Sequence, residues 1–217
     1  MSAHTALRIL LVDDHPVVRR GVADILIESF ARATVQQVSC GADAIRFTRA
    51  GRWDLVILDL TLPDGSGLDV LKRIREIEPR TPVLILSVHA ADQFEKRTIA
   101  AGASGYLTKQ AADVELVTVV NRLVRGGKYF SAEVLAQMAA RTRFTSDERP
   151  HERLSDREYE VLRQIGSGRT VSEIATVLAL SVKTISTYRA RLMEKMAMRT
   201  NAELTRYAVS HRLAEDE

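Results

Sequence analysis

Four ionisable side chains in the first half of the chain could form one reactive pocket. Asp13 and Asp14 close one apolar run, Asp59 closes another, and Lys109 follows a third. If these runs are parallel strands, their carboxyl ends open onto a common crevice. Three carboxylates in one crevice repel each other and require a cation such as Mg²⁺, which prefers carboxylate, phosphate and water oxygens. Asp59 would then be a nucleophile that accepts a phosphoryl group, with the metal ion and Lys109 offsetting charge on the transferring oxygens.

The run that carries Asp59 must be a buried strand for this chemistry to work. Leu55–Leu58 is short, apolar and bounded by Asp54 and Pro63, which is typical of a strand covered on both faces. This run alone is equally consistent with a second interpretation, in which Asp59 is only an acidic residue that opens a turn.

Short apolar runs alternate with helical spacing through the first half of the chain. We predict strands at Arg8–Asp13, Thr34–Val38, Leu55–Asp59, Pro82–Ser87 and Gly105–Leu107. Helical spacing appears at Val18, Val22, Ile25 and Ser29, at Ala42, Ile45 and Arg49, at Leu71, Ile74 and Glu78, and at Val117, Val120 and Val124. Such βα units predict an α/β fold, a doubly wound five-stranded parallel sheet with helices on both faces. Pro16 suits the first turn of the first helix.

The alternation stops at Gly126 and Gly127, and no strand pattern returns. We assign residues 1–127 to the α/β domain, residues 128–153 to a linker with a short helix from Ser131 to about Arg143, and residues 154–217 to a small all-α domain. Capping boxes at Ser155/Glu158 and Thr170/Glu173 predict the first two helices of that domain. A longer helix from Val182 to about Met198 and a last helix, capped by Asn201, complete a helix-turn-helix pattern.

Composition narrows the class of protein. The chain has 217 residues, a length that suits two domains. No apolar run is long enough to span a bilayer and no signal pattern opens the chain, so we expect a soluble cytoplasmic protein without a membrane partner. The one cysteine, Cys40, is best explained by packing. Between Ser181 and Arg212 seven basic residues stand against two acidic ones, a bias that suits a polyanion, although basic helix faces are often only solvated.

The motifs of the first domain resemble those of two-component receiver domains, which have a flavodoxin-like fold. They are LVDD at 11–14, LDLTLPDGSG at 58–67, LSV at 86–88 and GYLTK at 105–109. The resemblance implies that Asp59 is the phosphoacceptor. It also implies that Asp13, Asp14, Asp59 and the backbone carbonyl of Thr61 bind Mg²⁺, that Lys109 and Ser87 contact the phosphoryl group, and that Tyr106 moves with Ser87.

One residue departs from the family pattern. Receivers commonly follow the lysine with a proline, whereas Gln110 follows Lys109 here. A cis peptide bond at that place would cost about 2.5 to 4 kcal/mol without proline. Either the site supports that strain or the loop is arranged differently.

The second domain resembles the LuxR-type helix-turn-helix of NarL/FixJ response regulators. The motifs are LSDREYEVL at 154–162, SEIATVLALSVKTISTYRARLMEKM at 172–196 and NAELTRYA at 201–208. At about 100° per residue, an apolar stripe of the third helix must face the domain core, namely Ile185, Tyr188, Leu192 and Met196. The opposite side is left for DNA: we predict base contacts from Ser186, Thr187 and Ala190, and contacts to phosphates or bases from Lys183, Thr184 and Arg191. For Arg189, an internal ion pair and a phosphate contact are equally open.

Together the two resemblances imply a phosphorylation-dependent DNA-binding transcriptional regulator. A sensor histidine kinase supplies the phosphate, and the phosphorylated protein binds paired half-sites of double-stranded DNA as a homodimer; RNA polymerase is left open as a further partner. We expect no enzyme beyond self-phosphorylation from a phosphodonor and slow autodephosphorylation, at a rate tuned by Thr61 and His89. For His89, a surface histidine without such a role is the other interpretation left open. Three other classes stay open: a phosphatase-type enzyme, a receiver whose output is protein binding, and a regulator that is independent of phosphate.

Overall fold

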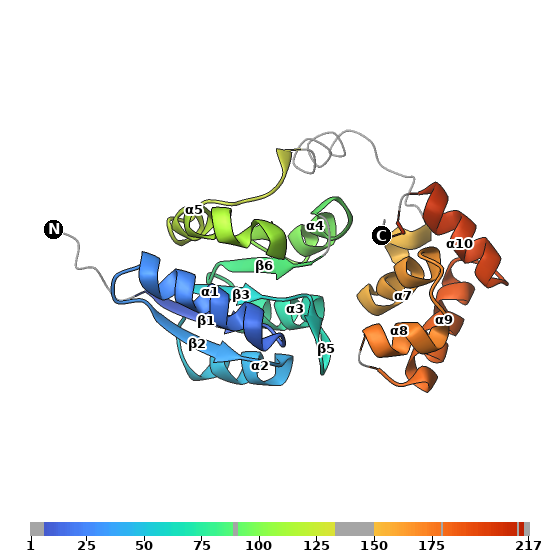
Figure 1. Ribbon diagram of the computed structural model, residues 1–217, viewed down its shortest axis with the longest axis horizontal. Coiled ribbons are helices and arrows are strands. Elements are labelled where there is room, and N and C mark those ends of the chain that lie inside the picture. The colour runs from blue at the N-terminus through green and yellow to red at the C-terminus, as the bar shows by residue number, and fades with distance from the viewer. Residues whose placement is uncertain (1–6, 89–90, 133–149, 179, 212, 215–217) are drawn as a thin grey trace. The chain divides into compact units, whose positions relative to one another are not determined.

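The computed structural model describes residues 7–88, 91–132, 150–178, 180–211 and 213–214 (Figure 1). The chain divides into two compact units, Met1–Arg143 and Phe144–Glu217. No helix among the described residues is long and apolar enough to cross a membrane.

The first unit is built on a five-stranded parallel sheet. Its strands are β1 (Arg8–Val12), β2 (Thr34–Val38), β3 (Leu55–Leu58), β6 (Val83–Ser87) and β7 (Gly105–Thr108), in the order β2-β1-β3-β6-β7. The predicted five-stranded parallel sheet is therefore confirmed. The chain order reverses direction between β1 and β3, and in such sheets the ligand crevice lies at that reversal.

Helices follow the strands and cover the sheet. They are α1 (Pro16–Ser29), α2 (Gly41–Ala50), α3 (Gly67–Ile77), α4 (Ala91–Ala100) and α5 (Ala112–Val124). Successive strand residues point to opposite faces: Ile9, Leu11 and Ile57 pack with apolar residues of α1 and α5 in one cluster. Leu10, Val56 and Leu58, of the opposite parity, are also fully buried. Burial of both parities explains why the strands read as unbroken apolar runs.

Helix α4 was not predicted from the sequence. Its buried face carries Phe94, Glu95 and Thr98, so polar residues occupy positions that an apolar stripe would need. A short antiparallel hairpin directly after β3, formed by β4 (Thr61–Leu62) and β5 (Gly65–Ser66), was also not predicted.

The described residues of the second unit form four helices after a 3-10 turn at Pro150–Arg153. These are α7 (Asp156–Gly166), α8 (Val171–Val177), α9 (Val182–Lys195) and α10 (Asn201–Ser210). Helix α7 packs against the other three, and the core contains Leu162, Ile165, Ile174, Ile185, Leu192 and Leu204. The predicted short helix from Ser131 falls almost wholly on residues 133–149, outside the described residues.

Side chains cap these helices largely as the sequence predicts. Both predicted capping boxes form, at Ser155/Glu158 and Thr170/Glu173. The predicted cap at Asn201 is wrong: Thr200 caps α10 and forms a third box with Glu203. The Asn201 side chain instead accepts a hydrogen bond from Arg189 Nε at 2.6 Å. Arg189 therefore makes an internal contact, to an amide rather than to a carboxylate.

Glu158 connects the start of α7 to the end of α9. Its Oε2 accepts hydrogen bonds from Ser155 N at 2.8 Å and from Lys195 Nζ at 2.7 Å. Burial alone would raise the pKa of Glu158, but the bonds from Lys195 and Ser155 lower the pKa below its ordinary value. The ionised carboxylate thus stabilises the fold of the second unit.

We expect Glu158→Gln to lower the free energy of unfolding of the second unit by about 1.5 to 3 kcal/mol at pH 7, the range for hydrogen bonds to charged groups. Because the folded pKa of Glu158 is lowered, the carboxylate stabilises the fold above pH 4.5, its ordinary value, and loses this effect as the pH falls through the folded value. The difference between wild type and variant should therefore shrink below pH 4.5. Hydrogen exchange of the α7 and α9 amides measures it. Glu194→Gln, at an exposed position of α9, is the control; equal losses in both variants would refute the assignment.

Candidate functional site

Three carboxylates meet where β1 and β3 end. Val12 pairs with Leu58 in the sheet, so Asp13 and Asp59 follow neighbouring strand ends, and Asp59 N donates to Val12 O at 2.9 Å. One ligand atom from each of Asp13, Asp14, His15 and Asp59 lies within 4.8 Å of the others. The side chains of Asp13 and Asp59 are 1% and 2% exposed. The structure therefore brings together the three acids predicted from the sequence.

Lys109 is the cation of this pocket. Its Nζ lies 2.7 Å from Asp13 Oδ2 and 2.7 Å from Asp59 Oδ2, and its side chain is 8% exposed. The peptide bond between Lys109 and Gln110 is trans, and both residues belong to a 3-10 turn, Lys109–Ala111. The loop after β7 thus delivers the ammonium group without a cis bond, which decides between the two arrangements left open by Gln110.

Burial and neighbouring charges have opposite effects on the pKa values of Asp59 and Lys109. Burial raises the pKa of Asp59 above its ordinary value, although Lys109 partly offsets this effect. Burial by itself would lower the pKa of Lys109, but Asp59 and Asp13 together raise it above its ordinary value. The ammonium group is therefore firmly charged, whereas an ionised Asp59 depends on the cations beside it.

The loop after Asp59 is held in place by bonds that the sequence analysis did not foresee. Thr61 N donates to Asp59 Oδ1 at 3.1 Å. Asp64, in the β4–β5 turn, accepts from Gly41 N and Ala42 N at 2.8 Å each, at the start of α2. A Cβ at Gly67 would lie 2.1 Å from Asp59 O, so only glycine lets α3 begin this close to the nucleophile. The PDGSG stretch was the only sequence signal of this turn.

The donor set fits a hard divalent cation. The carboxylates of Asp13, Asp14 and Asp59 supply the oxygens that Mg²⁺ prefers, clustered at one sheet edge. Coordination by the Thr61 carbonyl stays a prediction. His15 was not foreseen in this cluster: its Nδ1 lies 2.6 Å from Asp14 Oδ1, and its backbone N donates to Asp13 Oδ1 at 2.8 Å. Its position directly after the two acids was the available signal.

Ser87 and Tyr106 lie in the strands next to the acidic pocket. Ser87 is the last residue of β6, fully buried, and pairs with Thr108 of β7. Leu58 pairs with Ile85 in the sheet. The next residue of β6, Leu86, is therefore level with Asp59, and Ser87 follows Leu86. Tyr106 is buried within β7, and its backbone N donates to Tyr129 O at 2.9 Å. His89 lies outside the described residues.

In the second unit, α9 presents the predicted faces. Ile185, Leu192 and Met196 are buried and Tyr188 is half-buried, so the apolar stripe faces the core. Of the six predicted DNA-contacting residues, Thr184 is half-buried and its hydroxyl lies 2.7 Å from that of the N-cap residue Ser181. The others, Lys183, Ser186, Thr187, Ala190 and Arg191, are exposed.

The exposed hydroxyl groups of α9 have a defined hydrogen-bonding role. Ser186 Oγ donates to Val182 O at 2.8 Å, and Thr187 Oγ1 donates to Lys183 O at 3.0 Å. With their protons used inside the helix, both oxygens remain acceptors. They suit the amino groups of adenine or cytosine in the major groove.

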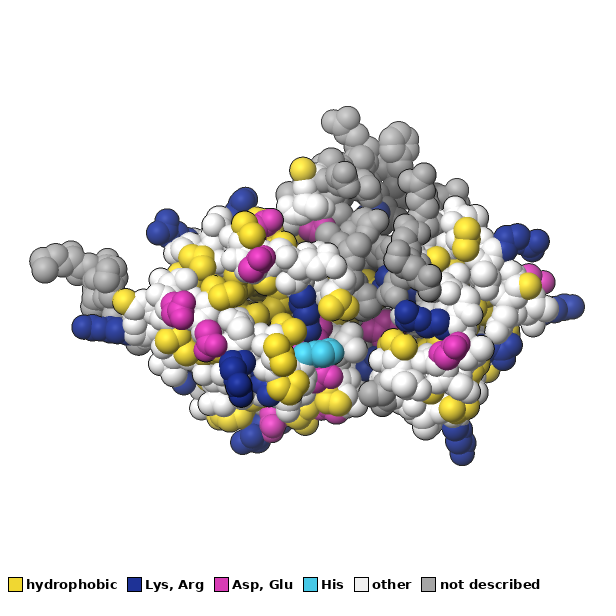
Figure 2. Space-filling model, in the orientation of Figure 1, with side chains coloured by type: hydrophobic (Ala, Val, Ile, Leu, Met, Phe, Trp, Pro, Cys, Tyr) yellow, Lys and Arg dark blue, Asp and Glu magenta, His cyan; other side chains and the backbone are white. Residues whose placement is uncertain are grey.

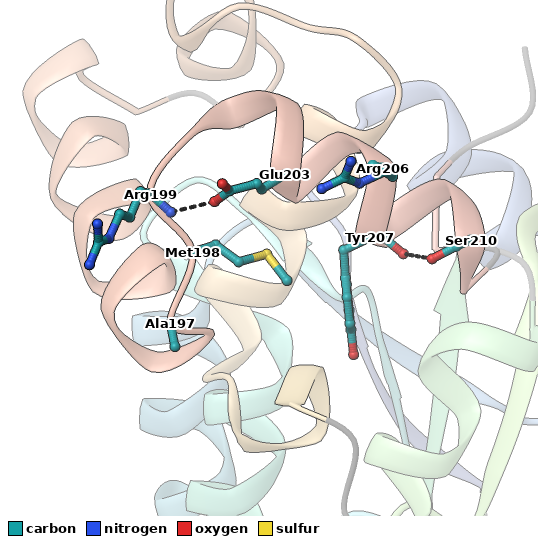
Figure 3. Close-up of a pocket in the computed structure, with 7 residues that line it drawn as sticks. All are labelled: Ala197, Met198, Arg199, Glu203, Arg206, Tyr207 and Ser210. Carbon is teal, nitrogen blue, oxygen red and sulfur yellow. Dashed lines mark hydrogen bonds between the residues drawn. The ribbon is translucent and has the colours of Figure 1, made fainter.

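A cleft of about 720 Å³ lies where α9 turns into α10 (Figure 3). Figure 3 shows Met198 and Tyr207 reaching into the space between the turn and α10, and Glu203 accepting a bond from Arg199 N. None of the six residues predicted to contact DNA lines this cleft. It is therefore separate from the exposed face of α9.

Comparison with known proteins matches each of the two units to a protein family. Residues 9–121 match the family model described as response regulator receiver domain, and residues 152–208 match that of bacterial regulatory proteins, luxR family. The response regulator UvrY of Escherichia coli O6:H1 is 34% identical over 212 residues, covering 97% of each chain.

Two solved structures of the response regulator RcsB are similar over nearly the whole chain. RcsB from Salmonella enterica serovar Typhimurium, bound to a promoter in the presence of phosphomimetic BeF₃⁻, is 25% identical with a TM-score of 0.57, covering 95% of this chain and 100% of that one. A structure of two RcsB dimers bound to two parallel DNAs is 25% identical with a TM-score of 0.57, covering 95% and 99%.

We expect Lys109→Met to lower the free energy of unfolding of the first unit by about 3 kcal/mol at pH 7, because it leaves Asp13 and Asp59 buried without their cation. Since the folded pKa of Asp59 is raised, protonation of its carboxyl relieves this loss as the pH falls through that value, and Mg²⁺ should relieve it at neutral pH. Denaturant titration followed by the fluorescence of Trp53, the single tryptophan and a buried residue of this unit, measures the change. Lys72→Met, at an exposed position of α3, is the control. Wild-type stability of Lys109→Met at pH 7 would contradict the proposed compensation.

Proposed function

This chain belongs to the NarL/FixJ family of response regulators, which join a receiver domain to a LuxR-type DNA-binding domain, and we propose that it is a DNA-binding transcriptional regulator switched by phosphorylation of Asp59. The observation that carries the proposal is the pocket where β1 and β3 end, in which Lys109 contacts both Asp59 and Asp13. An exposed polar face on α9 supplies the output.

The chemistry proposed for the pocket is phosphoryl transfer to a carboxylate. An Asp59 oxygen attacks the phosphorus of a phosphohistidine on a sensor kinase; a new O–P bond forms, the N–P bond breaks, and the imidazole leaves. Lys109 already touches Asp59 Oδ2 at 2.7 Å, so its ammonium can neutralise charge on the transferring oxygens. When bound by Asp13, Asp14 and Asp59, Mg²⁺ supplies further neutralisation. Attack by water on the same phosphorus later breaks the Asp59 O–P bond, which releases inorganic phosphate and restores the carboxylate.

The phosphoryl group changes the charge balance at the strand ends. It carries about −1.5 to −2 charges, in place of the single charge of the ionised Asp59 carboxylate, next to an ammonium that now balances Asp13 and Asp59. We propose that Lys109 and the Ser87 hydroxyl then bind the phosphoryl oxygens, and that Tyr106 shifts with the end of β6. No turnover of external substrates is part of this proposal.

The output proposed for the second unit is major-groove recognition by α9. Ser186, Thr187 and Ala190 would meet base edges, with Lys183 and Arg191 close to phosphates. The RcsB structure with dimers on DNA supports a homodimer on paired half-sites, whose centres a two-fold dimer would place about 10 to 10.5 bp apart or at multiples of that. Such a regulator acts in the cytoplasm, where the DNA is.

The decisive substitution is Asp59→Asn, which keeps the size of the side chain and removes the nucleophile. We expect it to abolish the increase in DNA affinity that a small phosphodonor with Mg²⁺ gives the wild type. Asp24→Asn, at an exposed position of α1, removes the same charge and should respond like the wild type. Binding isotherms at fixed salt measure the effect. A full phosphodonor response in Asp59→Asn would refute the proposed phosphoacceptor.

Substitutions on α9 should separate phosphate contacts from base contacts. Arg191→Ala should weaken binding to all duplexes similarly and reduce the slope of log affinity against log salt by about 1, whereas Thr187→Ala should cost about 1 to 3 kcal/mol on the preferred site and relax its specificity. Arg206→Ala, an exposed charge on α10, is the matched control. If Arg206→Ala weakens binding more than Arg191→Ala, α9 is not the recognition helix. If the chain shows no salt-dependent duplex binding, its output is protein binding.

A further inference from the structure

His15 places an imidazole ring beside the carboxylates of the acidic pocket. Its backbone N donates to Asp13 Oδ1 at 2.8 Å, which fixes the residue next to the end of β1. Its Nδ1 lies 2.6 Å from Asp14 Oδ1. His15 is also the N-cap residue of α1, but its side chain makes no capping hydrogen bond. The ring therefore lies at the pocket without serving the helix that follows it.

The neighbouring oxygen of Asp14 is available to a cation. Asp14 Oδ1 is itself buried, yet no described group donates a hydrogen bond to it, and its short contact with His15 Nδ1 lacks hydrogen-bond geometry. Buried charges in proteins are paired, hydrogen-bonded or bound to a metal ion. The side chains of His15 and Asp14 are 58% and 30% exposed, so an ion can reach both from solvent.

The spacing of four side chains suits a single metal ion. One ligand atom from each of Asp13, Asp14, His15 and Asp59 lies within 4.8 Å of the others. Nitrogen and oxygen ligands lie about 2.0 to 2.2 Å from Zn²⁺, so that ligands of the same ion are about 3 to 4 Å apart. A small closure of the crevice therefore brings all four atoms to coordination distance.

The imidazole changes the class of ion that the pocket prefers. Mg²⁺ takes carboxylate, phosphate and water oxygens, so it gains little from a ring nitrogen. Zn²⁺ is bound by imidazole as well as by carboxylate, and imidazole favours transition-metal ions in general. Three carboxylates with one imidazole thus form a mixed donor set that serves Zn²⁺ better than the carboxylates alone.

We propose that the His15 imidazole completes a site for a divalent transition-metal ion of the Zn²⁺ type, which competes with Mg²⁺ for Asp13, Asp14 and Asp59. The inference rests on the proposed function, because both ions share the acids around the phosphoacceptor. Zinc sites with four protein ligands are closed, whereas catalytic sites keep a position open. Binding of Zn²⁺ by all four side chains therefore leaves no position for a phosphoryl oxygen and opposes phosphorylation of Asp59.

The test uses the full chain without phosphodonor, with Zn²⁺ and Mg²⁺ as separate probes in isothermal titrations. The wild type should bind Zn²⁺ more tightly than Mg²⁺, and Mg²⁺ should weaken Zn²⁺ binding by competition. His15→Ala should lose about 10- to 100-fold in Zn²⁺ affinity, the range that loss of even an outer partner of a metal ligand produces. Its Mg²⁺ affinity should change by less than about 2-fold, which also shows that its pocket is folded.

Two further measurements identify the ligand and its effect. In nuclear magnetic resonance of the chain labelled with ¹⁵N-histidine, Zn²⁺ should shift a ring nitrogen signal that is absent from His15→Ala. At fixed Mg²⁺, added Zn²⁺ should slow loading of the wild type from a small phosphodonor and should slow His15→Ala less.

His211→Ala, which removes a histidine of the second unit, is the matched control and should bind both ions like the wild type. Asp14→Asn should weaken binding of both ions, because they share this carboxylate. If His15→Ala keeps the Zn²⁺ affinity of the wild type, or loses Mg²⁺ affinity to the same extent, the inference is overturned and the proposed function stands. If neither ion binds the wild type and a phosphodonor leaves its DNA affinity unchanged, both are overturned.

Discussion

The contact of one ammonium group with two buried carboxylates organises this molecule. Lys109 lies 2.7 Å from both Asp13 and Asp59, in a place where burial disfavours ionised acids. In this pocket, repulsion between the carboxylates is balanced by their attraction to Lys109. Additional negative charge at Asp59 must therefore be compensated by movement of the cations around it. A hydrophobic pocket of the same shape could not respond in this way, because it would have no charge to redistribute.

The fold supports this balance by placing rigid elements around it. Strands that are buried on both faces place Asp13 and Asp59 at neighbouring strand ends, and Lys109 follows β7, which is separated from β3 by β6. The absence of a side chain at Gly67 and the bonds from Asp64 to the start of α2 hold the loop after Asp59 against the nucleophile. At the edge of the sheet, Tyr129 forms a parallel bridge with Gly105 of β7. Figure 2 shows the surface of the first unit as a mixture of charged and apolar side chains, without one dominant patch on the face drawn.

Much of this arrangement could be predicted from the sequence, and each exception has a physical cause. Unbroken apolar runs such as Leu55–Leu58 and capping boxes such as Ser155/Glu158 are local signals, and the structure confirms them. Helix α4 escaped because Glu95 and Thr98 occupy its buried face. The buried carboxylate of Glu95 is explained by its hydrogen bond with Ser131, which lies 36 residues later in the chain. The N-cap of α10 was predicted at Asn201 but is Thr200, one residue earlier. Either residue type can cap a helix, so the sequence did not distinguish them. His15 and Asp64 act through contacts that no spacing rule encodes.

The central claim is that the charge state of Asp59 governs the affinity of α9 for DNA. The most direct measurement follows one sample of the full chain in time. The phosphoryl content of the protein after loading from a small phosphodonor with Mg²⁺ is recorded beside its affinity for a selected duplex at constant salt, until the phosphate has hydrolysed. We expect the DNA affinity to fall in step with the phosphoryl content and to return to the unloaded value. An affinity that stays constant while one phosphoryl group per chain is gained and lost would contradict it.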